Sequence, residues 1–149
     1  MRAILQRVSR AQVCVAGKTV GGIGAGFVVL LGVAKGDTEQ DAAFIADRTI
    51  GLRVFADSEG KMNLAIDKVG GEMLVISQFT LLADTESGRR PSFAPAAQPE
   101  EARHLYENFI SIAKNAGVRV EQGEFGASME VELVNDGPVT IILDSRNRR

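Results

Sequence analysis

The sequence predicts a mixed α/β fold: a three-layer β/β/α sandwich in which two mostly antiparallel sheets pack face to face and two main helices cover one outer face. Most strand-like segments either alternate apolar and polar residues or are wholly apolar, as strands do when one or both faces are buried. Two helical segments each carry a single apolar stripe, so each covers a sheet from one side. Strands, a helix, strands, a second helix and further strands follow one another along the chain. The pattern does not determine the strand order.

The N-terminal part of the chain is predicted to be β structure. Residues 1–15 alternate, residues 16–18 form a turn, and the glycine-rich residues 21–26 lead into the apolar run 27–34. These glycines lack the spacing of a dinucleotide-binding loop and precede a strand where that loop requires a helix. We therefore expect strands here and no nucleotide cofactor.

The first helix is predicted to begin after Thr38, the expected N-cap, with Asp41 completing a capping box. It should run for about three to four turns. Its apolar stripe consists of Ala42, Ile45, Ala46, Thr49 and Ile50. Residues 53–63 then indicate a strand, a turn and a strand. Residues 71–79 indicate a buried strand.

The second helix is predicted to follow a loop that contains three of the four prolines, residues 91–99. Pro99 suits the first helical position, and Gly117 suits the end of the helix. The apolar stripe between them consists of Ala102, Leu105, Tyr106, Phe109, Ala113 and Ala116. The remaining chain supplies the last strands.

Length and composition indicate one domain over residues 1–149, with residues 145–149 as a flexible, basic tail. The apolar fraction of 45% and the charged fraction of 24% are those of an ordinary globular protein. No apolar stretch approaches the ~20 residues of a membrane helix, and the first residues do not resemble a signal peptide, so we expect a cytoplasmic protein. The net charge of −2 argues against a protein that coats nucleic acid indiscriminately.

Cys14 is the only cysteine and His104 the only histidine. An intramolecular disulfide and a cysteine-rich zinc site are therefore excluded. His104 lies on the polar face of the second predicted helix, so we expect a solvated surface residue and no Ser-His-Asp triad. The sequence predicts no metal and no cofactor.

Residues 75–84, VISQFTLLAD, interrupt a buried strand with polar side chains. Ser77, Gln78 and Thr80 must each find a hydrogen-bond partner or lose about 1 to 3 kcal/mol. Taken alone, Ser77 and Thr80 could bond to each other or to neighbouring backbone groups, and Gln78 could point to solvent on an edge strand. A functional site at the end of this strand is the other interpretation.

The segment NDGPVT, residues 135–140, lies where the strand-like segment 129–134 ends and the strand-like segment 139–144 begins. Asp136-Gly137 is a typical hairpin turn signal. Pro138, however, removes an amide where the returning strand would begin to pair. The hairpin interpretation leaves that proline unexplained.

Taken together and in order, five segments resemble the D-aminoacyl-tRNA deacylases: RVFADSEGKMN, VISQFTLLADT, GRRPSF, LYENF and VNDGPVT. SQFT and N-x-G-P-x-T are the two signature motifs of that family. The resemblance extends from RAILQRV near the N-terminus to the last strand. It implies a homodimeric, metal-independent hydrolase that cleaves the ester between a D-amino acid and the 3′-terminal adenosine of tRNA. It also implies removal of glycine mischarged onto tRNA-Ala.

The resemblance assigns catalysis to Ser77, Gln78, Phe79 and Thr80. Because neither a plausible metal site nor a usable histidine is available, backbone amides are the economical donors for the oxyanion. The resemblance implies that the amides of Gln78 and Phe79 are the candidates. Thr80 could be a nucleophile, but no base is visible for its hydroxyl. The family resemblance and the missing histidine together favour a water molecule activated by the ribose 2′-hydroxyl of the substrate.

Rejection of L-amino acids is assigned by the resemblance to Gly137-Pro138, a cis pair that each subunit inserts into the pocket of its partner. A rigid wall placed where the L side chain must lie excludes it by clash. Arg7 matches a family arginine near this pair. Phe125 and Met129 match positions close to the pocket, and core packing explains them equally well.

Arg89 and Arg90 are expected to contact tRNA phosphates, and a solvated loop is the alternative. Two other functions stay open. The same fold could be a non-catalytic RNA-binding or assembly module, or a metal-independent hydrolase of small esters. With one tyrosine and no tryptophan, the chain offers little for an aromatic RNA-reading surface.

Overall fold

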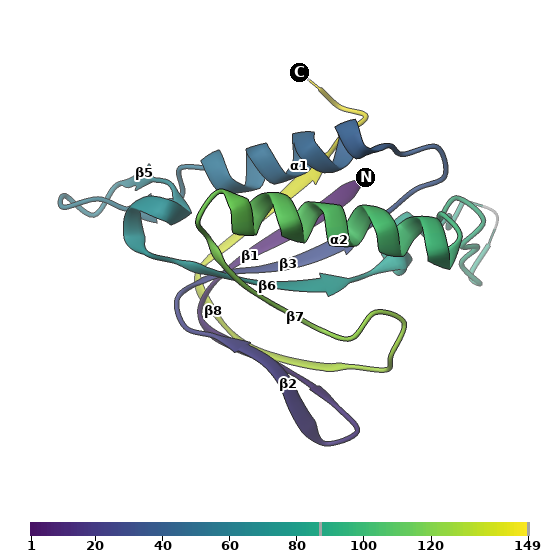
Figure 1. Cartoon of the computed structure of the whole chain (residues 1–149), viewed down its shortest axis with the longest axis horizontal. Coiled ribbons are helices and arrows are strands. Elements are labelled where there is room, and N and C mark those ends of the chain that lie inside the picture. Colours follow the sequence, from purple (N-terminus) through teal and green to yellow (C-terminus); the bar gives the residue numbers. More distant parts are fainter. Residues whose placement is uncertain (87, 149) are drawn as a thin grey trace.

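The computed structural model describes residues 1–86 and 88–148, and it places a curved six-stranded sheet beneath two helices (Figure 1). The sheet strands are β1 (Arg2–Val15), β2 (Lys18–Ile23), β3 (Gly26–Gly32), β6 (Glu72–Ser77), β7 (Arg119–Gln122) and β8 (Glu130–Asp144). A separate two-stranded hairpin consists of β4 (Phe55–Ala56) and β5 (Met62–Leu64). The helices are α1 (Glu39–Gly51) and α2 (Pro99–Asn115), with short 3₁₀ helices η1 (Ile66–Val69) and η2 (Phe79–Leu82).

The strands form one barrel-like sheet, so the predicted pair of stacked sheets is not what the hydrogen-bond ladder shows. β1 is long enough to pair with two strands along one edge. Its residues 2–8 pair with β3 and its residues 11–15 with β2, while β8 pairs along its other edge. All three pairings are antiparallel, whereas β3, β6 and β7 run parallel to one another. The shared strand therefore keeps both halves of the structure in one mixed sheet.

Two hydrophobic clusters lie on opposite faces of this sheet. Side chains of α1 and α2 pack with one face of β1, β3 and β6, around Phe27 and Phe109. On the other face the sheet curls around itself, and Val13, Ile23 and Leu74 belong to one buried cluster. The prediction that both helices cover the same face is confirmed (Figure 1).

Both helices begin where the sequence predicts, because their start signals are local. The Asp41 carboxylate accepts hydrogen bonds from the Thr38 amide at 2.8 Å and from the Thr38 hydroxyl at 3.0 Å. Pro99 occupies the first turn of α2, and Gly117, with a φ of 87°, follows its end. None of the helices in the described residues is both long and apolar enough to cross a membrane.

The last two predicted strands are one strand, β8, so the hairpin interpretation of residues 135–140 is wrong. β8 pairs with β1 on both sides of this segment. Val8 pairs with Asn135 and Gln6 with Thr140, so β8 advances by five residues where β1 advances by two. The additional residues form a bulge that leaves the ladder. Gly137 and Pro138 lie in this bulge and are exposed.

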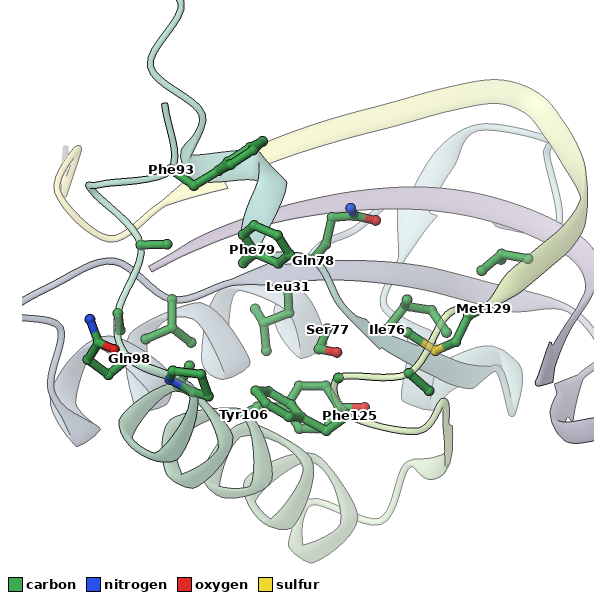
Figure 2. Close-up of a pocket in the computed structure, with 18 residues that line it drawn as sticks. Leu31, Ile76, Ser77, Gln78, Phe79, Phe93, Gln98, Tyr106, Phe125 and Met129 are labelled. Carbon is green, nitrogen blue, oxygen red and sulfur yellow. The ribbon is translucent and has the colours of Figure 1, made fainter. Parts of the chain in front are cut away.

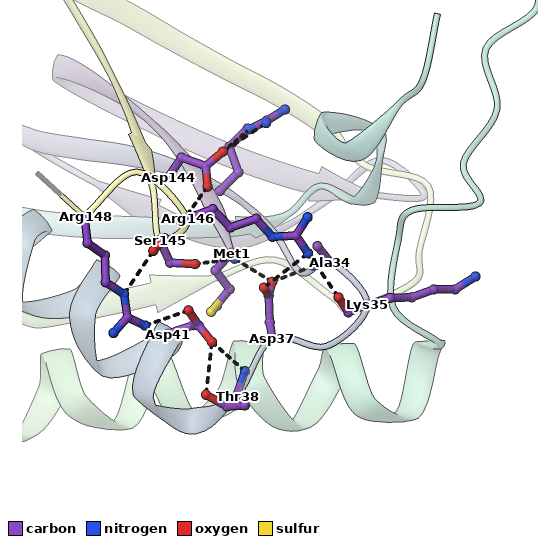
Figure 3. A network of polar contacts seen from close by, with 11 residues as sticks. Met1, Ala34, Lys35, Asp37, Thr38, Asp41, Asp144, Ser145, Arg146 and Arg148 are labelled. Atoms are coloured by element: carbon purple, nitrogen blue, oxygen red, sulfur yellow. Dashed lines mark hydrogen bonds and ion pairs between the residues drawn. The ribbon is translucent and has the colours of Figure 1, made fainter. Parts of the chain in front are cut away.

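The α-amino group of Met1 is buried in a polar network (Figure 3). It lies 2.5 Å from Asp37 Oδ2 and donates a hydrogen bond to Ser145 Oγ at 2.7 Å. The Ala34 amide donates to the same Asp37 oxygen at 2.7 Å. The Met1 side chain is completely buried and the Asp37 side chain is 3% exposed. This network joins the first residue to the end of β8 and to the segment that precedes α1.

Part of the predicted flexible tail lies against the protein in this network. Ser145 is buried, and Arg146 donates to the Lys35 carbonyl at 3.0 Å. Arg148 donates to Asp41 Oδ1 at 2.8 Å. Arg149 lies outside the described residues.

Asp41 is the acceptor that holds the tail to α1. Burial by itself would raise the pKa of Asp41, but hydrogen bonds from the Thr38 amide, Ser145, Arg148 and the Thr38 hydroxyl outweigh it. Together they hold this pKa well below its ordinary value. Asp41 is therefore a carboxylate at neutral pH.

Candidate active site

A cavity of about 540 Å³ opens where the parallel strands β3, β6 and β7 end. Parallel strands end at the same edge of a sheet, and such edges are the usual binding sites in sheets of this kind. The end of β6 contributes Ser77, Gln78 and Phe79, and the segment after β7 contributes Phe125 and Met129. The structure thus brings together five of the predicted site residues.

Figure 2 shows Ser77 between Phe79 on one side and Tyr106 and Phe125 on the other. The end of β3 contributes Leu31 to the lining. Helix α2 contributes one wall through Pro99, Ala102 and Tyr106. The lining is mostly apolar, which suits a site that holds an organic group and excludes water.

Gly32 allows η2 to fold over the end of β3. A Cβ atom at this position would lie 2.5 Å from Leu82 Cδ2 and 2.9 Å from the Gln78 carbonyl oxygen. No real side chain fits at those distances. The absence of a side chain at Gly32 therefore lets the SQFT segment turn immediately after the strand.

The turn decides which backbone amides are free. The Gln78 amide donates to the Leu31 carbonyl oxygen at 2.8 Å, so the expectation that it is an oxyanion donor is wrong. The amides of Phe79 and Thr80 begin η2 and have no acceptor among residues 1–86 and 88–148. Amides in the first turn of a helix have no partner within that helix. Of the two predicted donors, Phe79 alone has a free amide.

Thr80 is exposed and does not line the cavity. Its hydroxyl oxygen accepts a hydrogen bond from the side-chain amide of Gln78. An amide N–H is a donor and cannot remove the hydroxyl proton. The Thr80 hydroxyl is thus paired with Gln78, whereas the structural interpretation of the sequence paired it with Ser77 or the backbone and left Gln78 in solvent. Among the described residues, no base contacts the Thr80 hydroxyl.

Tyr106 supplies the cavity with an aromatic face. Its hydroxyl donates to the Val75 carbonyl oxygen at 2.9 Å, inside the core. Burial, with a smaller contribution from the charge of Glu107, raises the pKa of Tyr106 well above its ordinary value. Tyr106 therefore stays neutral and does not act as a base. Sequence reasoning placed it in the core stripe and missed its second role, because a stripe does not show where a sheet ends.

Two further aromatic contacts surround the cavity. Phe79 and Phe93 meet edge to face, with ring centroids 5.0 Å apart, and are 56% and 38% exposed. The Phe125 ring lies 5.6 Å from the Tyr106 ring, between centroids. The Arg103 guanidinium lies over the Phe125 ring, 4.9 Å from its centroid. The sequence analysis did not assign Phe93 or Arg103 to the site.

Arg7, Gly137 and Pro138 do not line the cavity of their own chain. Arg7 lies opposite the bulge in β8, donates to the Asp136 carbonyl oxygen at 3.1 Å and also contacts the Val54 carbonyl oxygen. The Gly137-Pro138 peptide bond is cis. These residues form a second group of predicted site residues, separate from the first.

Arg89 and Arg90 lie in an exposed loop. The loop is closed by paired hydrogen bonds between Asp84 and Ser92, at 2.8 and 2.9 Å. Within the described residues, neither arginine side chain forms a hydrogen bond or an ion pair.

His104 is on the surface of α2, as predicted, and its Nε2 lies 2.9 Å from Glu39 Oε1. It does not line the cavity. No group of three His, Cys, Asp or Glu side chains in the part of the chain that the structure describes is placed to hold a metal ion.

The family model and two curated relatives that match this chain are all described as deacylases of aminoacyl-tRNA. The family model described as D-Tyr-tRNA(Tyr) deacylase matches residues 4–144. A D-aminoacyl-tRNA deacylase of Dehalococcoides mccartyi is 60% identical over 148 residues, covering 99% of this chain and 97% of the relative. One from Thermotoga petrophila is 54% identical over 145 residues, covering 97% of each.

Two solved structures share the fold. One, described as the c-Myc DNA unwinding element binding protein, has a TM-score of 0.91 and 38% identity, covering 97% of this chain and 98% of its own. The other, described as a probable eukaryotic D-amino acid tRNA deacylase, has a TM-score of 0.80 and covers 95% of this chain and 97% of its own. At 18% identity, the second shows likeness of fold alone.

Proposed function

This chain belongs to the D-Tyr-tRNA(Tyr) deacylase family, and from that premise we propose that it hydrolyses the ester between a D-amino acid and the terminal adenosine of tRNA. Residues 1–149 would act as one domain in the cytoplasm, where tRNA is charged. The products are the free D-amino acid and a tRNA that can be charged again. The activity is a proofreading step that protects translation from D-amino acids.

One structural observation supports this proposal most directly. The free amide of Phe79 lies at the end of β6, beside a mostly apolar cavity that is large enough for an amino acid and part of a nucleoside. Attack on an ester carbonyl places negative charge on its oxygen, and a fixed amide stabilises that charge without reorganisation. The Thr80 amide is also free, but Thr80 does not line the cavity, so Phe79 is the proposed donor.

The nucleophile in this proposal is water, activated by the 2′-hydroxyl of the terminal ribose. Water adds to the ester carbon, the bond to the ribose 3′-oxygen breaks, and that oxygen takes up a proton. The Gln78–Thr80 contact supports this choice, because the partner of the Thr80 hydroxyl is a donor. Ser77 lines the cavity and would position the substrate.

We expect Thr80→Ala to keep at least about a tenth of the wild-type kcat on D-Tyr-tRNA. Loss of a true nucleophile typically costs several orders of magnitude. The measurement is single-turnover release of D-Tyr, and Thr80→Ser is the matched variant because it keeps the hydroxyl. Isolation of a covalent D-Tyr ester of Thr80 from native protein would contradict the water mechanism.

We propose that L-amino acids are rejected by Gly137-Pro138 of a second subunit. This pair is exposed on the β8 bulge and does not line the cavity of its own chain, so a partner chain is needed to bring it to a site. β8 also exposes four large apolar side chains, which favours a homodimer with its active sites at the interface. They are Val131, Leu133, Val134 and Ile142.

Rejection by a Gly137-Pro138 wall would still allow glycine as a substrate. A wall that excludes an L side chain by clash has nothing to exclude in a glycyl ester. We therefore propose that glycine mischarged onto tRNA-Ala is also removed.

The proposed activity is tested by incubating the purified protein with D-Tyr-tRNA and with L-Tyr-tRNA, each with and without a metal chelator. We expect D-Tyr release, no measurable L-Tyr release, and no effect of the chelator. Equal rates for both esters, or release only from small esters, would favour a general esterase.

A non-catalytic nucleic-acid-binding module is the second candidate. The 38% identical relative described as a DNA unwinding element binding protein favours it. The net charge of −2 and the exposed acidic side chains oppose it, since binding of nucleic acid without chemistry relies on phosphate contacts. Binding of D-Tyr-tRNA without any release of D-Tyr would select this alternative.

A further inference from the structure

We propose that Arg103 binds the phosphodiester that joins the terminal nucleoside of the tRNA to the rest of the strand. This inference rests on the proposed function, because it assigns a new contact to the same substrate. If the esterified ribose lies in the cavity, the phosphate on its 5′ side must leave the cavity over the rim. Arg103 does not itself line the cavity, but it lies one helical turn after Pro99 on α2, next to Ala102, and its guanidinium contacts Phe125. Pro99, Ala102 and Phe125 all line the cavity.

The position of the guanidinium is determined by the cavity wall. It lies 4.9 Å from the centroid of the Phe125 ring, and Phe125 lines the cavity. Phe125 is in turn held at 5.6 Å by Tyr106, whose hydroxyl is anchored to the core. A guanidinium stacked on an aromatic ring keeps its N–H edges available to an acceptor, and its planar fork suits phosphate oxygens.

The arginine is not used for an ion pair. Glu100 and Glu107 lie three residues before it and four residues after it on α2, the spacings at which helical ion pairs form. Among the described residues, Arg103 nevertheless makes no ion pair and no side-chain hydrogen bond. The guanidinium therefore contacts the Phe125 ring and does not pair with Glu100 or Glu107. Within the described part of the chain, its positive charge stays unpaired beside the cavity.

Arg48 offers a matched control on the other helix. It is also exposed on a helix, and its guanidinium lies 5.4 Å from the centroid of the Phe44 ring. No residue of α1 lines the cavity. Arg48→Gln removes the same charge and the same kind of stacking contact at a distance from the site.

The test compares Arg103→Gln, Arg48→Gln and wild-type protein on two substrates: D-Tyr-tRNA, and D-Tyr esterified to adenosine, which has no phosphate. We expect Arg103→Gln to raise KM for D-Tyr-tRNA about three- to tenfold with kcat unchanged. Its KM for the adenosine ester should stay at the wild-type value. The slope of log(kcat/KM) against log salt for D-Tyr-tRNA should fall by about 1, as expected for loss of one phosphate contact.

Arg48→Gln should match wild-type protein in all these measurements. Equal effects of the two substitutions would indicate general electrostatics and overturn the proposal. An unchanged KM for D-Tyr-tRNA in Arg103→Gln, or an equal change on both substrates, would do the same. Failure of the proposed function is distinguishable, because wild-type protein would then release no D-Tyr from D-Tyr-tRNA.

Discussion

Gly137→Ala is expected to lower the preference for D-Tyr-tRNA over L-Tyr-tRNA at least about tenfold, mainly by raising the rate on the L substrate. Gly137 has a φ of 129°, a conformation that L residues rarely adopt. A Cβ atom there would lie 2.9 Å from Val139 Cγ2 and 3.0 Å from Arg7 Nη2. The bulge would have to change shape, and with it the position of the surface that we propose as the wall.

The effect on folding should be small by comparison. The bulge is exposed and leaves the β1–β8 ladder, so the strain of about 1 to 3 kcal/mol can be relieved without disturbing the core. Gly17→Ala is a matched control, because Gly17 also has a positive φ, 78°, but has no atom within 4 Å of the added Cβ.

The test measures hydrolysis of D-Tyr-tRNA and of L-Tyr-tRNA by wild-type protein, Gly137→Ala and Gly17→Ala, at equal subunit concentration. The two variants should show similar stability, and only Gly137→Ala should hydrolyse L-Tyr-tRNA faster. A folded Gly137→Ala dimer with unchanged selectivity would remove this bulge from the proposed mechanism.

Asp37→Ala is expected to lower the free energy of unfolding by about 3 to 5 kcal/mol. Asp37 Oδ2 lies 2.5 Å from the buried Met1 amino group and accepts a hydrogen bond from the Ala34 amide. Arg146 is 3.8 Å from the other oxygen. Removing the carboxylate leaves a buried ammonium group with Ser145 as its remaining partner. A loss of this size is a large fraction of the about 5 to 15 kcal/mol of a typical domain.

Guanidinium chloride unfolding at one fixed protein concentration measures this difference, since the stability of an oligomer depends on concentration. Glu59→Ala is the control, because Glu59 pairs with Lys61 at the surface, where both side chains are more than two thirds exposed at 71% and 74%. Its midpoint should stay close to that of wild-type protein. If the midpoint of Asp37→Ala were also close to that of wild-type protein, the buried ion pair between Met1 and Asp37 would contribute little to the free energy of unfolding.

The features that sequence predicts well are those with local causes. The starts of α1 and α2 depend on residues within one turn, Thr38 with Asp41 and Pro99, and both are confirmed. The apolar stripes also place both helices over one face of the sheet. The ordered motifs identify the family, and the SQFT segment does lie at a cavity.

The errors concern contacts between residues far apart in the chain. Asp136-Gly137 carries a typical turn signal, yet β8 continues because β1, more than a hundred residues earlier, pairs with it on both sides. The Gln78 amide looked available in the sequence, but the Leu31 carbonyl of a neighbouring strand occupies it. Neither partner can be identified from the segment itself.

The sequence by itself determined the helices, most of the strands, the family and the identity of the residues that gather at the end of β6. Only the tertiary structure decided that the strands form one curved sheet, that residues 136–139 bulge out of β8, and that Phe79 has the free amide. It also decided that Arg103 stacks on the cavity wall. The physical reason is range: caps and stripes act over a few residues, whereas strand pairing and backbone hydrogen bonds depend on which distant segments the folded chain brings together.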